Sequence, residues 1–361
     1  MQVVGSVKYW RDGCMIALDI LKDVPADPMT PVLQFEILDL RHFSANSLRH
    51  VLEQESLIWS SRLRWDYRAS ADLLLQYLDS RVLPGYVAVE NGRVTGYVFC
   101  VYEDSKAVIG DVFASPTRPS EATAAEVECR LLEHLIELLQ NSPGMERIES
   151  QLLLHPHRTH ALTFERAGFR LFRRLFLELD LTAAGPQPTA ADRFLPASLH
   201  LRRWEEKDFS AAGRLISAAY EDHLDSFIND QYRSTAGSLR FLHNIVRFPG
   251  CGLFDAAASR VVVDRSSDEM VGLLLCSRVR DDVGHVTQIC VAKSHRSLGL
   301  GTVLLEACAT DLRRRRFQAL TLTVTEANQN AVALYRKMGF VERHSFDAMV
   351  WEKAVERRRR F

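Results

Sequence analysis

The sequence predicts an α/β fold built from two tandem halves, each with a mixed sheet flanked by helices. Strand-like apolar runs alternate with amphipathic helical stretches along the chain. Segment 182–198 is rich in Pro, Ala and Gly and lacks hydrophobic periodicity, which is typical of a linker. The two halves end alike, in Arg166-Ala-Gly168-Phe169 and Lys337-Met-Gly339-Phe340. An internal repeat of one structural unit explains this likeness.

The length of the chain agrees with that division. At ~150 residues per domain, 361 residues suit two domains. We expect an N-terminal extension at 1–34, a first domain at 35–181, a linker at 182–198, a second domain at 199–352 and a basic tail at 353–361.

Composition narrows the class of function. The formal net charge of -1 favours neither nucleic acid nor a membrane as partner. Charges interrupt the first residues, and no apolar run approaches ~18 residues, so we expect neither a signal peptide nor a membrane span. The seven cysteines are odd in number, widely spaced and without a Cys-x-x-Cys motif. They predict a cytoplasmic protein with no disulfide framework and no bound metal.

Hydrophobic periodicity places the individual elements. In the second half we expect strands at 199–203, 260–263, 271–279, 285–291, 319–325, 340–343 and 346–351, and helices at 209–219 (capped by Asp208), 234–246, 301–315 and 330–338, with Gly339 as the C′ residue of the last helix. In the first half we expect strands at 36–40, 86–90, 94–102, 108–113 and 147–154, helices at 45–54, 69–78, 123–140 and 160–167, and a hairpin turn at Asn91-Gly92.

A glycine-containing loop between a strand and a helix carries the strongest chemical signal. It reads Arg296-Ser-Leu-Gly299-Leu-Gly301-Thr302. Glycine lets the backbone approach a phosphate, and the first N–H groups of the helix lack intrahelical acceptors. Gly299, Leu300, Gly301 and Thr302 would donate to an anion, and Arg296 would add charge.

Together with a second motif, this loop resembles the GNAT family of N-acetyltransferases. The loop fits the family's Arg/Gln-x-x-Gly-x-Gly/Ala pyrophosphate motif, and Asn328-x-x-Ala331-x-x-Leu334-Tyr335 fits its later Asn…Tyr motif. The resemblance covers about 199–351. The first half resembles the same fold with eroded motifs, a tandem layout similar to that of mycothiol synthases.

The resemblance implies acetyl-coenzyme A as cofactor and a centrally splayed sheet in each half. The pantetheine arm would bond the strand backbone near Ile289 and Val291, and Asn328 would contact the cofactor from the other side of the splay. The cofactor-binding residues are then Ile289, Val291, Arg296, Leu298, Gly299, Leu300, Gly301, Thr302 and Asn328.

The implied reaction is direct attack of a primary amine on the acetyl carbonyl. Tyr335 would act as the general acid, since a phenol with a pKa of ~10 is protonated at neutral pH. The base stays open, because Thr321 and Thr323 stand where some family members carry a carboxylate. His285 is the leading candidate; Glu326, Glu221, Asp222 and Asp225 are alternatives.

The acceptor is expected to bind beside the segment 220–232. Its aromatic and polar residues suit a cationic amine: Tyr220, Asp225, Asn229 and Tyr232. A small-molecule amine and a peptide amine, as in ribosomal-protein acetylation, both remain open, as do another acyl group and a monomer or homodimer. A rival hypothesis is a non-catalytic module that binds acetyl-coenzyme A as a regulatory ligand; the missing strand carboxylate favours it.

The first half departs from the motifs where the chemistry requires them. Segment 118–123 lacks both glycines and carries Glu121, Phe164 stands in the position of Tyr335, and His157 stands in that of Asn328. We therefore expect this half to support and shape the second half without binding acetyl-coenzyme A productively.

Overall fold

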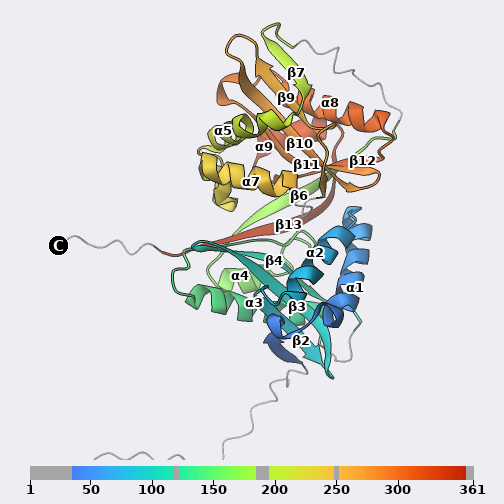
Figure 1. Cartoon of the computed structure of the whole chain (residues 1–361), viewed down its shortest axis with the longest axis vertical. Coiled ribbons are helices and arrows are strands. Elements are labelled where there is room, and N and C mark those ends of the chain that lie inside the picture. The colour runs from blue at the N-terminus through green and yellow to red at the C-terminus, as the bar shows by residue number, and fades with distance from the viewer. Residues whose placement is uncertain (1–34, 118–121, 184–194, 248–251, 355–361) are drawn as a thin grey trace, which may run out of the picture. The chain divides into compact units, whose positions relative to one another are not determined.

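Thirteen strands form one continuous sheet in the computed structural model, which describes residues 35–117, 122–183, 195–247 and 252–354. The predicted N-terminal extension, most of the linker and most of the basic tail lie outside these residues. The α/β class with two similar halves is confirmed (Figure 1). The helices and strands of the first half are β1 Glu36–Asp39, α1 Ala45–Leu63, α2 Arg68–Asp79, β2 Gly85–Glu90, β3 Arg93–Glu103, β4 Lys106–Ala114, α3 Ala124–Asn141, β5 Arg147–Gln151, α4 Ala161–Arg166 and β6 Arg170–Asp180.

The second half repeats this order with small additions. Its elements are β7 Leu199–Arg203, α5 Phe209–Tyr220, α6 Asp225–Ile228, α7 Thr235–Arg247, β8 Leu253–Phe254, β9 Arg260–Asp264, β10 Glu269–Arg280, β11 Val283–Val291, α8 Leu300–Arg314, β12 Ala319–Thr325, α9 Gln329–Lys337 and β13 Val341–Glu352. Four short 3₁₀ turns complete the described chain: Leu40–His42, Glu206–Asp208, Asp230–Arg233 and Lys293–His295.

The last strand of each half lies in the other half's part of the sheet. The strand order is β1-β2-β3-β4-β5-β13-β6-β12-β11-β10-β9-β7, and β8 pairs with β10. Strand β13 therefore pairs with β5, and β6 pairs with β12. In Figure 1, β6 in light green and β13 in dark red run between the two sets of strands. The exchange joins the halves through backbone hydrogen bonds.

Helices cover both faces of each half of the sheet. One core of the first half gathers the apolar faces of α1 and α2, and another gathers those of α3 and α4. In the second half, α8 and α9 cover one face and α5 and α7 the other. Each helix buries an apolar stripe, which offsets the entropy of ordering its residues.

Local signals set several element ends as predicted. Asn91 and Gly92 both have positive φ, 50° and 75°, as an Asn-Gly hairpin turn requires. Gly339 follows α9 with a φ of 91°, so it is the expected C′ glycine. Among the described residues, no helix combines the length and apolarity needed to cross a bilayer.

Three predictions about elements were wrong, and other elements were missed. Helix α1 continues to Leu63 rather than Gln54, because Trp59 and Leu63 extend its buried face. The strands expected at 340–343 and 346–351 are one strand, β13, with an irregularity between Glu342 and His344. Strand β6 was not predicted at all. Asp208 is the N-cap residue of α5, but its side chain does not cap the helix; its carboxylate accepts hydrogen bonds from Arg202 and from the backbone N–H of Glu205.

Candidate active site

A cavity opens where strands β11 and β12 separate. The two strands pair in parallel from Val283 and Ala319 as far as Val286 and Leu322. Both continue beyond that point, β11 beside β10 and β12 beside β6. The space between them is a cavity of about 660 Å³, lined by both strands and by the first turns of α8 and α9. This volume is within the range of small-molecule sites.

The glycine loop forms one end of the cavity. Gly299 immediately precedes α8 and has a φ of 77°, a left-handed conformation that favours glycine. Gly301 lies so close to α9 that an added Cβ would be 3.2 Å from Leu334 Cδ2. Gly299, Leu300, Gly301 and Thr302 all line the cavity. The first N–H groups of α8 therefore lie at its wall, where the helix dipole favours an anion.

Of the two other predicted residues in this loop, Arg296 and Leu298, only the first lines the cavity. Arg296 lines the cavity, and its Nη2 donates a hydrogen bond of 2.8 Å to the carbonyl of Ala219. That contact holds the guanidinium beside the loop. Leu298, also predicted to bind cofactor, is half exposed and is not part of the cavity wall.

Strand β11 presents its backbone along the middle of the cavity. Ile289 and Val291, the predicted cofactor-binding positions on this strand, both line the cavity. The N–H of Ile289 donates to Gln288 Oε1 at 2.8 Å, and the Tyr220 hydroxyl donates to the same oxygen at 2.9 Å. A ligand that hydrogen-bonds to this strand edge would replace the Gln288 side chain as the acceptor for the N–H of Ile289.

Tyr335 lies at the opposite wall, on α9. Its side chain is buried and lines the cavity. Burial raises the pKa of Tyr335; the nearby Asp225 carboxylate raises it further, and Arg174 lowers it. The phenol therefore stays protonated at neutral pH. Asn328 begins the same helix, where its Oδ1 accepts from the N–H of Ala331 at 3.3 Å.

The segment between α5 and α7 closes the cavity near Tyr335. Tyr220, Asp225 and Tyr232 line the wall, and the two tyrosine rings stack at 4.3 Å. Asp225 Oδ1 accepts a hydrogen bond of 2.5 Å from Thr325 on β12. Asn229 is not in the wall; its side chain accepts from the N–H of Gln231 and begins a 3₁₀ turn.

His285, the leading candidate for the base, lies outside the cavity. It pairs with Thr321 where β11 and β12 are still hydrogen-bonded, at the closed end of the splay. Its ring packs at 5.0 Å from Trp65 and 5.8 Å from Phe176, outside the cavity wall. Burial lowers the pKa of His285 to about 3, so the imidazole is neutral.

Of the alternative bases, Asp225 alone lines the cavity. Glu326 pairs with Arg173 at 2.8 Å, and Glu221 pairs with Lys293 at 3.0 Å. Asp222 is exposed and has a φ of 59° in a turn.

Arg174 is a cavity residue that the sequence did not point to. It lies on β6 of the first half, in register with Thr325 of β12. Its Nη2 donates to Thr323 Oγ1 at 3.2 Å, and its Nη1 is 3.8 Å from Asp225 Oδ1. His223, between Tyr220 and Asp225, also lines the wall. The exchange of β6 thus places a cation from the first half in the site of the second.

Comparison with known proteins identifies the half that carries this cavity. Residues 215–340 match the Acetyltransferase (GNAT) family, a span that contains the glycine loop, Asn328 and Tyr335. We call the C-terminal half, which contains this match, the GNAT domain. A curated relative, an N-alpha-acetyltransferase of Sulfurisphaera tokodaii, is 38% identical over 60 residues, 16% of this chain. That alignment spans only 36% of the relative's length.

Solved structures extend the fold likeness to both halves. A GCN5-related N-acetyltransferase from Sphaerobacter thermophilus is 16% identical, with a TM-score of 0.59 over 90% of this chain and 97% of that one. A tandem GNAT protein from the clavulanic acid biosynthesis pathway, solved without AcCoA, is also 16% identical, with a TM-score of 0.55 over 88% and 98%. The GNAT domain therefore belongs to a tandem arrangement of two similar folds.

The first half differs from the GNAT domain at the equivalent positions. Phe164 is fully buried and packs 5.0 Å from Phe169, as Tyr335 packs beside Phe340 at 5.8 Å. His157 is bonded to Asp347 of β13 at 2.6 Å. Residues 118–121, expected to replace the phosphate loop, lie outside the described chain.

Proposed function

We propose that this chain is an acetyl-coenzyme A dependent N-acetyltransferase that acts on a primary amine. The observation that supports it is one continuous cavity, in which the glycine-rich start of α8 and the Tyr335 side chain line the same splay between β11 and β12. The start of α8 at one end suits the phosphates of coenzyme A, and the protonated phenol of Tyr335 at the other end suits the thioester.

In this proposal each part of the cofactor meets a different element. The pyrophosphate accepts hydrogen bonds from the first N–H groups of α8, with Arg296 beside it. The pantetheine arm runs along β11 at Ile289 and Val291 like an added strand. The thioester then lies toward Tyr335 and Asp225.

The reaction would use these two side chains in sequence. Asp225, directly or through a water, accepts a proton from the ammonium, and the free amine attacks the acetyl carbonyl carbon. The carbon–sulfur bond breaks as the amide forms, and the thiolate of coenzyme A takes the phenolic proton of Tyr335. The second proton that the amine nitrogen loses on becoming an amide returns to the tyrosinate, and Asp225 releases its proton to solvent. General acid and base steps of this kind contribute typically ~10²–10⁴-fold each. His285 has no step here, because it lies outside the cavity.

The acceptor that suits this site best is an α-amino group of a peptide or small molecule. An α-amino group has a pKa of about 8, against ~10 for an alkyl amine. A larger fraction of it is therefore unprotonated at neutral pH, so the reaction depends less on proton removal by Asp225. The similarity to an N-alpha-acetyltransferase points the same way. The aromatic wall of Tyr220 and Tyr232 suits a flat or apolar first side chain.

Thiol release tests the proposal directly. The full chain is incubated with acetyl-coenzyme A and a panel of α-amino peptides, alkyl amines and amino acids, and free thiol is measured. We expect release with at least one α-amino acceptor. Thiol release by none of them, although calorimetry detects acetyl-coenzyme A binding, would favour a regulatory binding module; failure to bind would remove the site assignment itself.

The variant Tyr335→Phe separates catalysis from binding. We expect kcat to fall by about 10²-fold or more, because the thiolate then leaves unprotonated, while the Kd for coenzyme A is unchanged. The exposed Tyr77, changed to Phe, is the matched control and should keep full activity. Equal loss of binding and turnover in Tyr335→Phe would assign the residue a packing role instead.

A further inference from the structure

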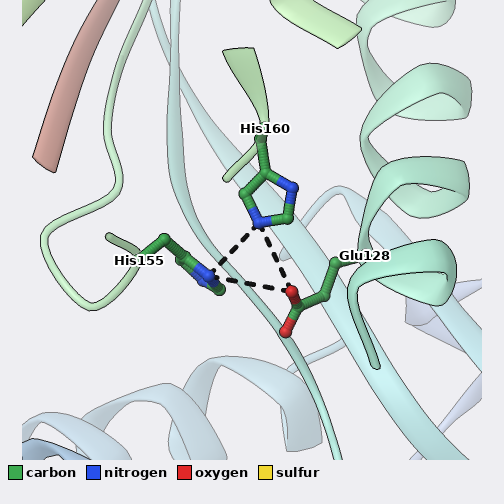
Figure 2. Close-up of side chains that lie close together, drawn as sticks. All are labelled: Glu128, His155 and His160. Atoms are coloured by element: carbon green, nitrogen blue, oxygen red, sulfur yellow. Dashed lines mark hydrogen bonds and ion pairs between the residues drawn. The ribbon is translucent and has the colours of Figure 1, made fainter. Parts of the chain in front are cut away.

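A second cluster of chemically active side chains lies in the first half, apart from the cavity of the GNAT domain. Glu128 on α3, His155 after β5 and His160 at the start of α4 are all buried, and their side chains converge (Figure 2). His160 Nε2 is 3.3 Å from Glu128 Oε2 and 3.2 Å from His155 Nδ1. His155 Nδ1 is 3.7 Å from the same carboxylate oxygen.

These three distances match the edges of a metal coordination polyhedron. A triangle with such sides has a point about 2.0 Å from each corner, which is the length of a Zn–N or Zn–O bond. Two imidazole nitrogens and one carboxylate oxygen are a ligand set that zinc uses in proteins.

The remaining polar atoms of the three side chains hold them in this orientation. His155 Nε2 donates to the carbonyl of Val112 at 2.7 Å, so Nε2 carries the hydrogen and the neutral ring has its lone pair on Nδ1. Glu128 Oε1 accepts from the N–H of Ala114 at 3.0 Å. His160 Nδ1 contacts Cys129 Sγ at 3.6 Å. Such outer contacts orient metal ligands.

Hydrogen bonds within the cluster leave one acceptor atom without a proton of its own. The lone pair of His155 Nδ1 and the carboxylate of Glu128 are both acceptors, and His160 Nε2 can offer at most one proton between them. Buried acceptors that face each other are costly. A divalent cation would satisfy all three atoms at once.

The cluster also occupies the first half's counterpart of the cofactor site. Strand β4 pairs with β5 as far as Ile109, and Val112 and Ala114 are three and five residues beyond that point. Ile289 and Val291 are three and five residues beyond Val286, the corresponding last pair of β11. The backbone groups that would meet pantetheine in the GNAT domain are here bonded to His155 and Glu128.

The two histidines are specific to the first half. Counting back from the glycine that follows the helix, His160 corresponds to Ala331, and His155 corresponds to Glu326, whose carboxylate is paired with Arg173. The GNAT domain therefore has no histidine at either position, which is consistent with a separate role for the cluster.

We propose that Glu128, His155 and His160 bind a divalent transition metal, Zn²⁺ by ligand chemistry, that fixes the splay between β4 and β5 where a cofactor would otherwise sit. The ion joins α3, the segment after β5 and the start of α4. Its role is structural, and it is independent of acetyl transfer.

The test is metal content and thermal stability of the full chain. After loading with Zn²⁺ and extensive dialysis, elemental analysis should find about one Zn²⁺ per chain, and a strong chelator should lower Tm. Co²⁺ in place of Zn²⁺ should give the visible absorption of a four-coordinate site. Retention of no metal, with no change of Tm on adding Zn²⁺, would overturn the proposal.

Variants show whether these three residues hold the ion. His160→Ala and Glu128→Gln should lose stoichiometric Zn²⁺ and the Zn²⁺-dependent rise in Tm; Glu128→Gln keeps an acceptor for Ala114 and should still fold. The control His134→Ala changes an exposed histidine on the same helix as Glu128 and should bind like the wild type. Equal zinc content in all three variants would place the ion elsewhere and contradict the assignment.

Discussion

At the scale of single residues, two charged side chains near Tyr335 influence the pKa of its phenol. Asp225 and Arg174 have opposite effects on the pKa of this phenol, which burial raises. Arg174 comes from the first half, and its guanidinium lies between Thr323 and Asp225. We infer that Arg174 limits the rise in the pKa of Tyr335 and places a positive charge beside the Asp225 carboxylate.

Changing Arg174 to Met should lower kcat/KM by about tenfold or more, because Thr323 then loses its donor and Asp225 a nearby cation. A hydrogen bond to a charged group is worth ~1.5–3 kcal/mol. Steady-state kinetics on the full chain would measure it. Arg173→Met is the matched control: Arg173 is the next residue on β6, so it faces the other side of the sheet, where it pairs with Glu326. Equal losses in both variants would show that the effect comes from the strand and not from the cavity.

At the scale of elements, the separation of β11 from β12 creates the cavity, and the start of α8 makes one end of it favourable for an anion. The left-handed Gly299 turns the chain from the strand into the helix, so the first N–H groups lie at the cavity wall. Gly144, after α3, has the same φ of 77°, and at both glycines nothing lies within 4 Å of an added Cβ.

This pair gives a controlled substitution. Gly299→Ala and Gly144→Ala should each lower the free energy of unfolding by ~1–2 kcal/mol, the strain of a left-handed alanine. Only Gly299→Ala should also raise the Kd for coenzyme A, by about tenfold or more, because its methyl group enters the anion site. Thermal melts and calorimetry would measure the two effects. An unchanged Kd in Gly299→Ala would argue against phosphate binding at this loop.

At the scale of the whole molecule, the exchange of β6 and β13 makes the halves interdependent. Phe346, Ala348 and Val350 of β13 are buried while their strand pairs with β5 and β6. Neither half can keep its sheet intact if the other unfolds. The first half is thus a structural part of the half that carries the cavity, and it also supplies Arg174.

We therefore expect both halves to unfold in one cooperative transition. Phe346→Ala should lower the free energy of unfolding by about 3–5 kcal/mol, the cost of a large core deletion. Amide exchange should report that loss equally in peptides from α1 and from β9. Val341→Ala, at an exposed position of the same strand, should change neither. A loss confined to one half would mean that the halves unfold independently.

Neighbouring residues alone are enough to predict several features of this protein. Backbone preferences and hydrophobic periodicity predicted three of them: the Asn91-Gly92 turn, the glycine after α9 and the glycine loop at 296–302. Tyr335 and Asn328 were predictable because one helical motif fixes their spacing on α9.

The folded chain alone shows which distant segments meet. The alternation of apolar residues in β6 does not specify β12 as its partner, so nothing local indicated Arg174 as a cavity residue. His285 is on the predicted strand, yet the point at which β11 and β12 part leaves it at the closed end. Glu128, His155 and His160 come from three elements without a ligand spacing along the chain. Strand pairing is a long-range choice of register and partner, and local sequence patterns do not encode it.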